Sequence, residues 1–292
     1  YIFSQKFSFP AILINDDLEK KEVLKIVDLY QPKFIFCEKK IFSKFKEKKF
    51  KKNFNFLNIV IYENTNTVEY KIHQKLALLL TTSGTMGTAK FVKLSYENLK
   101  KNTDSIIKYL NLNNKSKSIT SLPYSYSYML SVINTHLESG GSIHVTNESI
   151  IQKNFWSDFK KHKIDSFNGV PYSYEILLKF NLNKLFKNLK IKYFTQAGGK
   201  LDIEKLKEII MFSKKVKAKF FTMYGQTEAS PRISYLSPKF ALKKIGSIGK
   251  SLKNTKMLII NNRNKEIKKS FTKGEIAFQG KNIFIGYSKN YN

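Results

Sequence analysis

Short apolar runs alternate with longer amphipathic stretches along most of the chain. The short runs have the length and texture of strands, and they lie at Phe34–Cys37, Ile59–Tyr62, Leu76–Leu80, Ile143–Thr146, Ser166–Asn168, Lys192–Thr195 and Lys219–Thr222. The longer stretches place apolar residues at helical spacing, and they lie at Leu18–Leu29, Tyr96–Leu110, Ile151–His162, Tyr172–Phe180 and Asp202–Phe212. Ser95 is a predicted N-cap, with Glu97 in the first turn that follows. Such alternation is typical of an α/β fold, which is the class we expect.

The pattern changes near Leu236. Beyond this point, short strand-like pieces are separated by turn signals, namely Asn254, Asn261-Asn262, Lys273-Gly274 and Gly280. We therefore expect an α/β region over residues 1–236 and a β-rich subdomain over residues 237–292.

Length and composition are those of a globular protein. With 292 residues, 42% of them hydrophobic and 14% aromatic, the chain can bury a large core. No run approaches the ~18 uncharged apolar residues of a membrane span. The chain begins at Tyr1, and Lys6 and the Asp16-Asp17 pair interrupt any signal-peptide pattern, so we expect that an N-terminal piece is missing. The single cysteine, Cys37, permits no internal disulfide and fits a cytoplasmic location.

The formal net charge of +30 is a feature that could indicate a nucleic-acid or membrane-surface binder. However, Arg232 and Arg263 are the only arginines, whereas proteins that contact phosphates and base edges rely on the planar guanidinium. The lysines are spread over the whole chain, so we expect solvated surface positions and no nucleic-acid partner. The densest run, Lys39 to Lys52, is predicted to be a basic helix face or a loop.

The four histidines show no spacing typical of metal ligands. They are His73, His136, His144 and His162. We predict ordinary structural or surface roles for them.

A loop rich in glycine and hydroxyl residues follows the apolar run Leu76–Leu80, and a strand-like pattern resumes at Phe91. The loop consists of Thr82, Ser83, Gly84, Thr85, Met86, Gly87, Thr88, Ala89 and Lys90. Two glycines let the backbone turn tightly and point N–H groups at an anion, while the hydroxyls and Lys90 add further donors. In a Walker A loop the lysine directly follows the second glycine, which it does not here. The loop has the parts of a polyphosphate site, and a polar hairpin turn is the alternative.

Two further strands run into glycine-containing loops. One loop contains Gln196, Ala197, Gly198, Gly199 and Lys200, and the other contains Tyr224, Gly225, Gln226, Thr227 and Glu228. In an open α/β sheet such loops lie at the carboxyl edge, where ligands bind. Tyr224 offers a flat face for a base, Thr227 a hydroxyl, and Glu228 a hard oxygen ligand for Mg²⁺. A solvated surface acid is the alternative for Glu228.

Together these segments resemble the large domain of the adenylate-forming superfamily, which includes acyl-CoA synthetases, nonribosomal-peptide adenylation domains and firefly luciferase. The loop at residues 82–90 is similar to the family's Thr-Ser-Gly-Thr-Thr-Gly-x-Pro-Lys signature, and residues 224–228 match its Tyr-Gly-x-Thr-Glu. Gly246–Lys250 and the later Gly274-Glu275, Gly280 and Gly286-Tyr287 resemble two further elements. The resemblance implies layered α/β sheets flanked by helices, with a distorted, barrel-like β subdomain toward the C-terminus.

The resemblance also implies a two-step reaction. A substrate carboxylate attacks the α-phosphorus of ATP to give an acyl-adenylate and pyrophosphate, and CoA or a phosphopantetheine carrier then accepts the acyl group. Residues 82–87 and Lys90 would hold the β- and γ-phosphates. Gly198, Gly199 and Lys200 would line the adenine site, with Tyr224 on the base. Thr227 would contact the α-phosphate, and Glu228 would bind Mg²⁺.

Several departures from the family pattern bear on activity. Met86 stands where the family has Thr or Ser, Ala89 replaces the usual Pro, and Lys200 lies where a small residue is common. The ribose-binding Asp of the family lies just beyond the last residues, as does the small C-terminal domain that carries a catalytic lysine. We therefore expect residues 1–292 alone to bind ATP weakly and to adenylate poorly. A degenerate, non-catalytic nucleotide-binding module is the alternative.

In the family, part of the acyl pocket comes from the segment that matches residues 122–128. Tyr126 lies where many members have His, and the segment lacks the Asp that anchors an amino group, which argues against a standard α-amino acid. Asn168, Gly169 and Gln196 supply polar groups near the same site. A wall rich in Tyr, Ser and Asn favours a small or polar carboxylic acid, unless these tyrosines are core aromatics.

Overall fold

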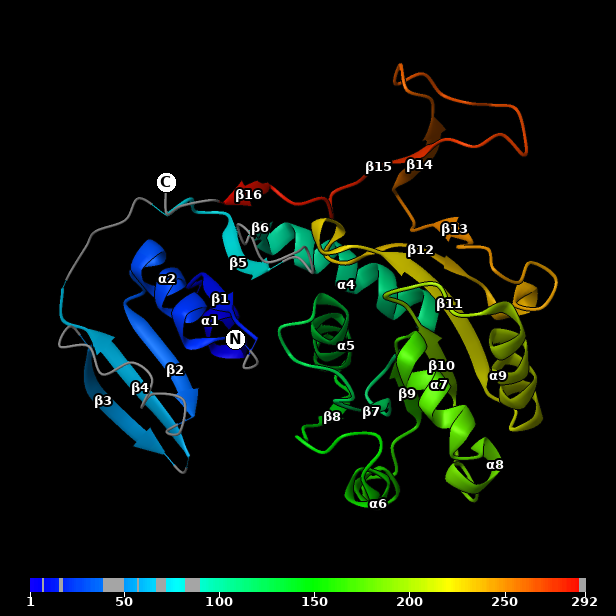
Figure 1. Ribbon diagram of the computed structural model, residues 1–292, viewed down its shortest axis with the longest axis horizontal. Coiled ribbons are helices and arrows are strands. Elements are labelled where there is room, and N and C mark those ends of the chain that lie inside the picture. Colours follow the sequence, from blue (N-terminus) through cyan, green and yellow to red (C-terminus); the bar gives the residue numbers. More distant parts are fainter. Residues whose placement is uncertain are drawn as a thin grey trace.

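The computed structural model describes residues 1–6, 8–15, 18–38, 50–56, 58–66, 72–81 and 90–288 (Figure 1). Residues 82–89 lie outside these ranges, so the predicted phosphate loop is described only at Lys90. Residues 39–49 of the lysine run also lie outside them. The run's last residues, 50–52, begin strand β3 (Phe50–Phe56), so the prediction of a helix face or loop is wrong there.

A five-stranded sheet of order β13-β12-β11-β10-β9 forms the centre of the larger part of the fold. Strands β9 (Ser166–Gly169), β10 (Tyr193–Gln196) and β11 (Lys219–Gly225) are parallel to one another. Strands β12 (Arg232–Leu236) and β13 (Lys250–Ser251) extend the sheet in antiparallel fashion. The expected α/β class is thereby confirmed.

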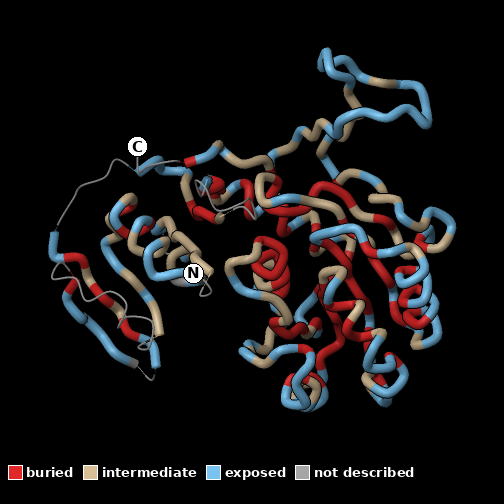
Figure 2. The backbone as a smooth tube through the Cα atoms, viewed as in Figure 1, coloured by how far each residue is buried: buried red, intermediate tan, exposed pale blue. Residues whose placement is uncertain are grey.

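Helices cover both faces of this sheet (Figure 1). One face packs against α7 (Pro171–Lys179), α8 (Leu182–Leu185) and α9 (Ile203–Lys215), and the other against α4 (Tyr96–Leu110) and α5 (Ser127–Glu138). Side chains alternate between the two cores, since Phe194 and Phe220 face the first set of helices while Tyr193 and Phe221 face the second. Burial is accordingly concentrated around this sheet (Figure 2).

A second sheet carries the strand that precedes the predicted phosphate loop. Its order is β1-β5-β6-β16, with β5 (Leu76–Thr81) between β1 (Ala11–Leu13) and β6 (Phe91–Ser95). Strand β16 (Gly286–Ser288) pairs antiparallel with β6, so the last described residues lie beside a strand from the first third of the chain. The loop at residues 82–89 therefore connects two paired antiparallel strands.

Smaller elements complete the description. A three-stranded sheet of order β2-β4-β3 contains β2 (Phe34–Glu38) and β4 (Ile59–Asn64) beside β3. Short helices and strands elsewhere are α1 (Ile2–Lys6), α2 (Lys20–Tyr30), β7 (Lys117–Ile119), β8 (Ser142–His144), α6 (Lys153–Lys161), and the 3₁₀ turns η2 (Thr227–Ala229) and η3 (Pro238–Phe240). No helix within the described ranges is long and apolar enough to cross a bilayer.

The expected barrel-like arrangement after Leu236 is not found in the described residues. Of the strands in this region, only β14 (Lys256–Ile260) and β15 (Glu275–Gln279) pair with each other, as a projecting two-stranded ribbon. Strand β13 adds to the five-stranded sheet, and β16 adds to the sheet of β5 and β6. The strands cannot close into a barrel because their partners belong to three different sheets.

Helix α4 shows how sequence sets a boundary. It spans the predicted residues, and Ser95 is its N-cap: Ser95 Oγ accepts a hydrogen bond from the Asn98 backbone N–H at 3.0 Å. Asn98 Oδ1 in turn accepts from the Ser95 N–H at 2.8 Å. This reciprocal capping box satisfies two backbone donors that would otherwise be buried without partners.

We expect Ser95→Ala to lower the free energy of unfolding by about 1 kcal/mol, because the Asn98 N–H loses its acceptor. Urea denaturation followed by circular dichroism measures the change. Ser105→Ala on the same helix is the matched control. The Ser105 hydroxyl donates to the Lys101 carbonyl within the helix and caps no backbone N–H. Equal losses in the two variants would contradict the capping role.

Candidate active site

Three parallel strands end at the same edge of the five-stranded sheet. In the ladder, Gln196 at the end of β10 pairs with Gly169 at the end of β9 and with Thr222 of β11. The loops that follow these strands therefore open at one edge. The structure thus brings together the predicted adenine loop, the Tyr224–Glu228 loop and the predicted substrate residues.

The loop after β10 is a tight backbone turn. Gly198 has a φ of +82°, and a Cβ there would collide with the Tyr126 hydroxyl, so a larger residue would be strained and would clash. The buried Gln196 side chain donates from Nε2 to the Gly199 carbonyl at 2.8 Å. Gln196 therefore fixes the loop, while Gly198, Gly199 and Lys200 are exposed at its surface.

Two buried asparagines that the sequence did not reveal hold the loop after β11. Asn102 of α4 donates from Nδ2 to the carbonyls of Ala229 and Arg232 at 3.1 and 3.0 Å. Asn282 donates to the same two carbonyls at 2.8 and 2.9 Å. Inside the loop, the Gln226 N–H donates to the Pro231 carbonyl at 2.8 Å. The backbone that carries Thr227 and Glu228 is thus fixed from two sides.

Lys90, Glu228 and Tyr287 lie together, although they are distant in sequence. Tyr287 Oη donates to Glu228 Oε1 at 2.9 Å, and Lys90 Nζ lies 5.6 Å from the centroid of the Tyr287 ring. The hydrogen bond to Glu228, with partial burial, raises the pKa of Tyr287, so the hydroxyl stays protonated and donates. The structure therefore places the predicted phosphate lysine and the predicted metal ligand at one location.

Thr227 faces the start of helix α5. Its Oγ1 lies 3.2 Å from Ser127 Oγ, within hydrogen-bond distance. Tyr224 and Gly225 are partly exposed beside it, and Gln226 is exposed. The hydroxyl predicted to contact an α-phosphate therefore lies at the junction of the β11 loop and α5, a helix that the sequence pattern did not indicate.

The predicted substrate residues occupy two different positions. Tyr126 is half-buried against the glycine turn, whereas Asn168 is buried below it. The Asn168 amide donates to Ser118 Oγ at 2.9 Å and accepts from Thr195 Oγ1 at 2.6 Å. Gly169 is buried as well, and a Cβ there would lie 2.9 Å from the Phe167 ring. Asn168 and Gly169 thus form the floor below the edge rather than its surface.

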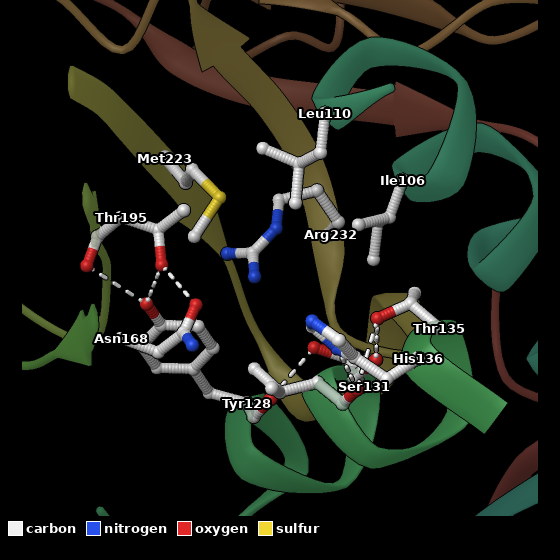
Figure 3. Close-up of a pocket in the computed structure, with 11 residues that line it drawn as sticks. Ile106, Leu110, Tyr128, Ser131, Thr135, His136, Asn168, Thr195, Met223 and Arg232 are labelled. Atoms are coloured by element: carbon white, nitrogen blue, oxygen red, sulfur yellow. Dashed lines mark hydrogen bonds between the residues drawn. The ribbon is translucent and has the colours of Figure 1, made fainter. Parts of the chain in front are cut away.

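A small internal cavity lies between the sheet and helices α4 and α5, with room for about one water molecule (about 10 Å³). Its lining consists of Ile106, Leu110, Tyr128, Ser131, Val132, Thr135, His136, Asn168, Thr195, Met223 and Arg232. The Arg232 guanidinium points into it (Figure 3). From the sequence, Arg232 stood out only as one of the two arginines. The residues around it form no pattern that would predict its burial.

Two of the histidines form a cluster that the sequence did not suggest. His144 of β8 stacks on His162 with ring centroids 3.9 Å apart, and His144 Nε2 lies 3.3 Å from Asp158 Oδ2 of α6. The ligand atoms of the three residues lie within 4.8 Å of one another, so they could hold a divalent metal ion. His136 instead has a structural role, since it contacts the Val132 carbonyl and the Tyr193 hydroxyl.

Comparison with known proteins places this edge in context. The sequence model of a family described as AMP-binding enzyme matches residues 4–288. An oxalate–CoA ligase of Saccharomyces cerevisiae is 26% identical over 80% of this chain and 42% of its own length. The chain spans about half the length of the relatives it matches.

Solved structures agree on the fold. An o-succinylbenzoate–CoA synthetase from Bacillus subtilis, in complex with an acyl-adenylate intermediate, superposes with a TM-score of 0.72 at 21% identity, over 95% of this chain and 56% of that chain. The same synthetase in complex with ATP and magnesium ion superposes with a TM-score of 0.72 at 20% identity, over 98% and 59%. At these identities the likeness concerns the fold.

Proposed function

Because the chain belongs to the AMP-binding enzyme family, we propose that it is the nucleotide- and acyl-binding part of a ligase that activates a small or polar carboxylic acid with ATP. The reaction is formation of an acyl-adenylate and pyrophosphate, followed by transfer of the acyl group to CoA or to a carrier protein. The observation that best supports this proposal is that Lys90, Tyr287 and Glu228 lie together beside the loops at the carboxyl edge of the sheet.

The residues at this edge fit ATP and Mg²⁺. Glu228 Oε1 is engaged by Tyr287, and no hydrogen bond or ion pair within the described ranges involves Oε2, which leaves a hard oxygen for a magnesium ion. Lys90 supplies a cation for phosphate oxygens, and Tyr224 supplies an aromatic face for adenine. Magnesium would supply charge neutralisation on the phosphates, and Thr227 with Lys90 would position them. The ATP and magnesium complex of the Bacillus subtilis synthetase supports this assignment.

The acid is proposed to be small or polar. The acids named for the relatives, oxalate and o-succinylbenzoate, are polar, which supports this choice. A cytoplasmic location is part of the proposal, since the lone Cys37 forms no internal disulfide.

The test is an ATP–pyrophosphate exchange assay of the complete protein against a panel of carboxylic acids. We expect exchange with at least one small or polar acid and none without acid. A degenerate nucleotide-binding module would bind ATP without exchange by any acid, and that result would overturn the proposed activity.

Within the same assay we expect Lys90→Ala to raise the KM for ATP about tenfold or more, because a charged donor to the phosphates is lost. Lys108→Ala, a surface lysine in the last turn of α4, is the matched control and should leave the KM unchanged. An unchanged KM in Lys90→Ala would remove this lysine from the phosphate site.

A further inference from the structure

Arg232 is a buried cation in the interior of the fold. Only 2% of the residue is exposed, although it has the longest charged side chain of the buried set. Within the described part of the chain no carboxylate forms an ion pair with it, and its Nε has no hydrogen-bond partner. The guanidinium of an arginine is charged in proteins, so Arg232 brings a full positive charge into the interior. A buried charge without a counter-ion is costly, and such a group calls for an anionic partner.

The contacts that Arg232 does make are with tyrosines. Its guanidinium carbon lies 5.1 Å from the centroid of the Tyr128 ring, in a cation–π contact, and the Tyr109 hydroxyl is a hydrogen-bond partner. Burial raises the pKa of Tyr109, Tyr126 and Tyr128, and the positive charge of Arg232 only partly opposes this. All three phenols are therefore neutral at physiological pH, and none is the counter-ion.

The other polar groups around the cavity are already engaged with the protein. The Tyr128 hydroxyl contacts Thr195 Oγ1 at 2.6 Å, and Thr195 Oγ1 donates to Asn168. Ser131 and Thr135 donate to helix carbonyls of α5. Within the described part of the chain, Arg232 Nε thus remains an unpaired donor beside the cavity, and the planar guanidinium matches a carboxylate.

The cavity lies directly below the proposed site of activation. Arg232 pairs with Gly225 across the β11–β12 ladder, so it is one strand away from the loop of Thr227 and Glu228. Thr195 and Asn168 line the cavity and are followed at once by Gln196 and Gly169 at the sheet edge. A short molecule whose reacting carboxylate lies at the edge would therefore place its far end toward the guanidinium.

We propose that Arg232 binds a second carboxylate of the substrate, so that the acid activated at this site is a short dicarboxylic acid. This inference rests on the proposed function and names its substrate class. Met223 lies beside the guanidinium in the cavity wall (Figure 3), and its unbranched, flexible side chain can move to enlarge the cavity when the distal carboxylate enters. The buried cation favours acids that carry a second negative charge over acids with a neutral tail.

The first experiment measures binding, without catalysis. Calorimetry of the protein with C2 to C6 dicarboxylates is compared with their monoamides, which have nearly the same shape but lack the second charge. We expect at least one diacid to bind tenfold or more tightly than its monoamide, and Arg232→Met to abolish that difference. Arg263→Met removes the other, exposed arginine and should retain it. Equal binding of diacid and monoamide by the unmodified protein would overturn the proposal.

The variants also separate a ligand-binding role from a structural one. If Arg232 only stabilises the fold, Arg232→Met unfolds at a lower temperature than the unmodified protein. If the charge of Arg232 serves to bind a ligand, ligand-free Arg232→Met unfolds at the same temperature as the unmodified protein or a higher one, because the substitution removes an uncompensated buried charge. Arg232→Lys keeps the charge and should retain part of the diacid preference. The comparison of diacid with monoamide needs no variant, so it stands even if Arg232→Met fails to fold.

Pyrophosphate exchange then distinguishes the two proposals. Exchange driven by diacids and lost in Arg232→Met supports both. Exchange driven equally well by neutral-tailed acids such as butyrate refutes the role of Arg232 and leaves the ligase activity intact. Tight, Arg232-dependent binding of a diacid without exchange by any acid refutes the activity and leaves the carboxylate site.

Discussion

Acid-dependent pyrophosphate exchange is expected to fall about a hundredfold when Glu228 is replaced by glutamine. The substitution preserves shape and the ability to accept the hydrogen bond from Tyr287. It removes the negative charge that we assign to magnesium, so the phosphates would lose the neutralisation that nucleotidyl transfer requires. The measurement is the exchange rate at several magnesium concentrations, and part of the activity should return as magnesium is raised.

Two variants show whether the carboxylate itself matters. Tyr287→Phe removes the hydroxyl that contacts Glu228 but keeps the charge, so only a severalfold loss is expected. Glu275→Gln removes an exposed acid on β15 and should have no effect. If Glu228→Gln exchanges pyrophosphate at the unmodified rate, Glu228 is a surface acid, which is the alternative that its sequence context left open.

Gly225→Ala is expected to destabilise the fold by about 3 kcal/mol and to abolish exchange. A Cβ at this position would overlap the Pro231 carbonyl oxygen and would lie 2.9 Å from its carbon and 3.1 Å from Arg232 Cα. These are backbone atoms, and Asn102 and Asn282 hold the Arg232 backbone in place, so they cannot yield as a side chain would. Urea denaturation measures the loss of stability, and an ATP-binding assay measures whether the loop after β11 keeps its conformation.

Gly246→Ala is the matched control. Gly246 has a φ of +81°, which costs an alanine about 1–2 kcal/mol, but among the described residues a Cβ there would meet only the flexible Ile203 Cδ1, at 3.0 Å. The same substitution therefore causes backbone strain at Gly246 and a collision with rigid backbone atoms at Gly225. Similar losses in the two variants would show that the contact between Gly225 and Pro231 is not rigid.

The central part of the fold could be predicted from sequence because its signals are local. The short runs around residues 166, 193 and 219 contain aromatic residues and lead into glycine-containing loops, and helix α4 has a capping box at its start. Parallel strands must end at one edge, so the loops at Gly198 and Tyr224 could be placed together before any contact was known.

The missed features depend on partners that are remote in sequence. Helix α5 has no side-chain cap at Tyr126 and buries residues on several sides, so its pattern lacks a clear polar face. Strands β1, β7 and β16 have three residues each, too few to show periodicity. The burial of Arg232 follows from its place on β12 beneath α4 and α5, which spacing alone does not encode.

Because Asn282 lies late in the chain, the loop after β11 can be fixed only after most of the chain has been synthesised. Its amide reaches back to the carbonyls of Ala229 and Arg232, and Ser230 Oγ donates to the Asn282 carbonyl at 2.8 Å. A few residues later, β16 pairs with β6, and Tyr30 Oη contacts Ser288 Oγ at 3.2 Å. On the ribosome, the sheet and its flanking helices can therefore form well before the nucleotide loop is held in shape. A nascent chain would thus acquire its fold first and its competence to bind ATP only when this late segment has emerged.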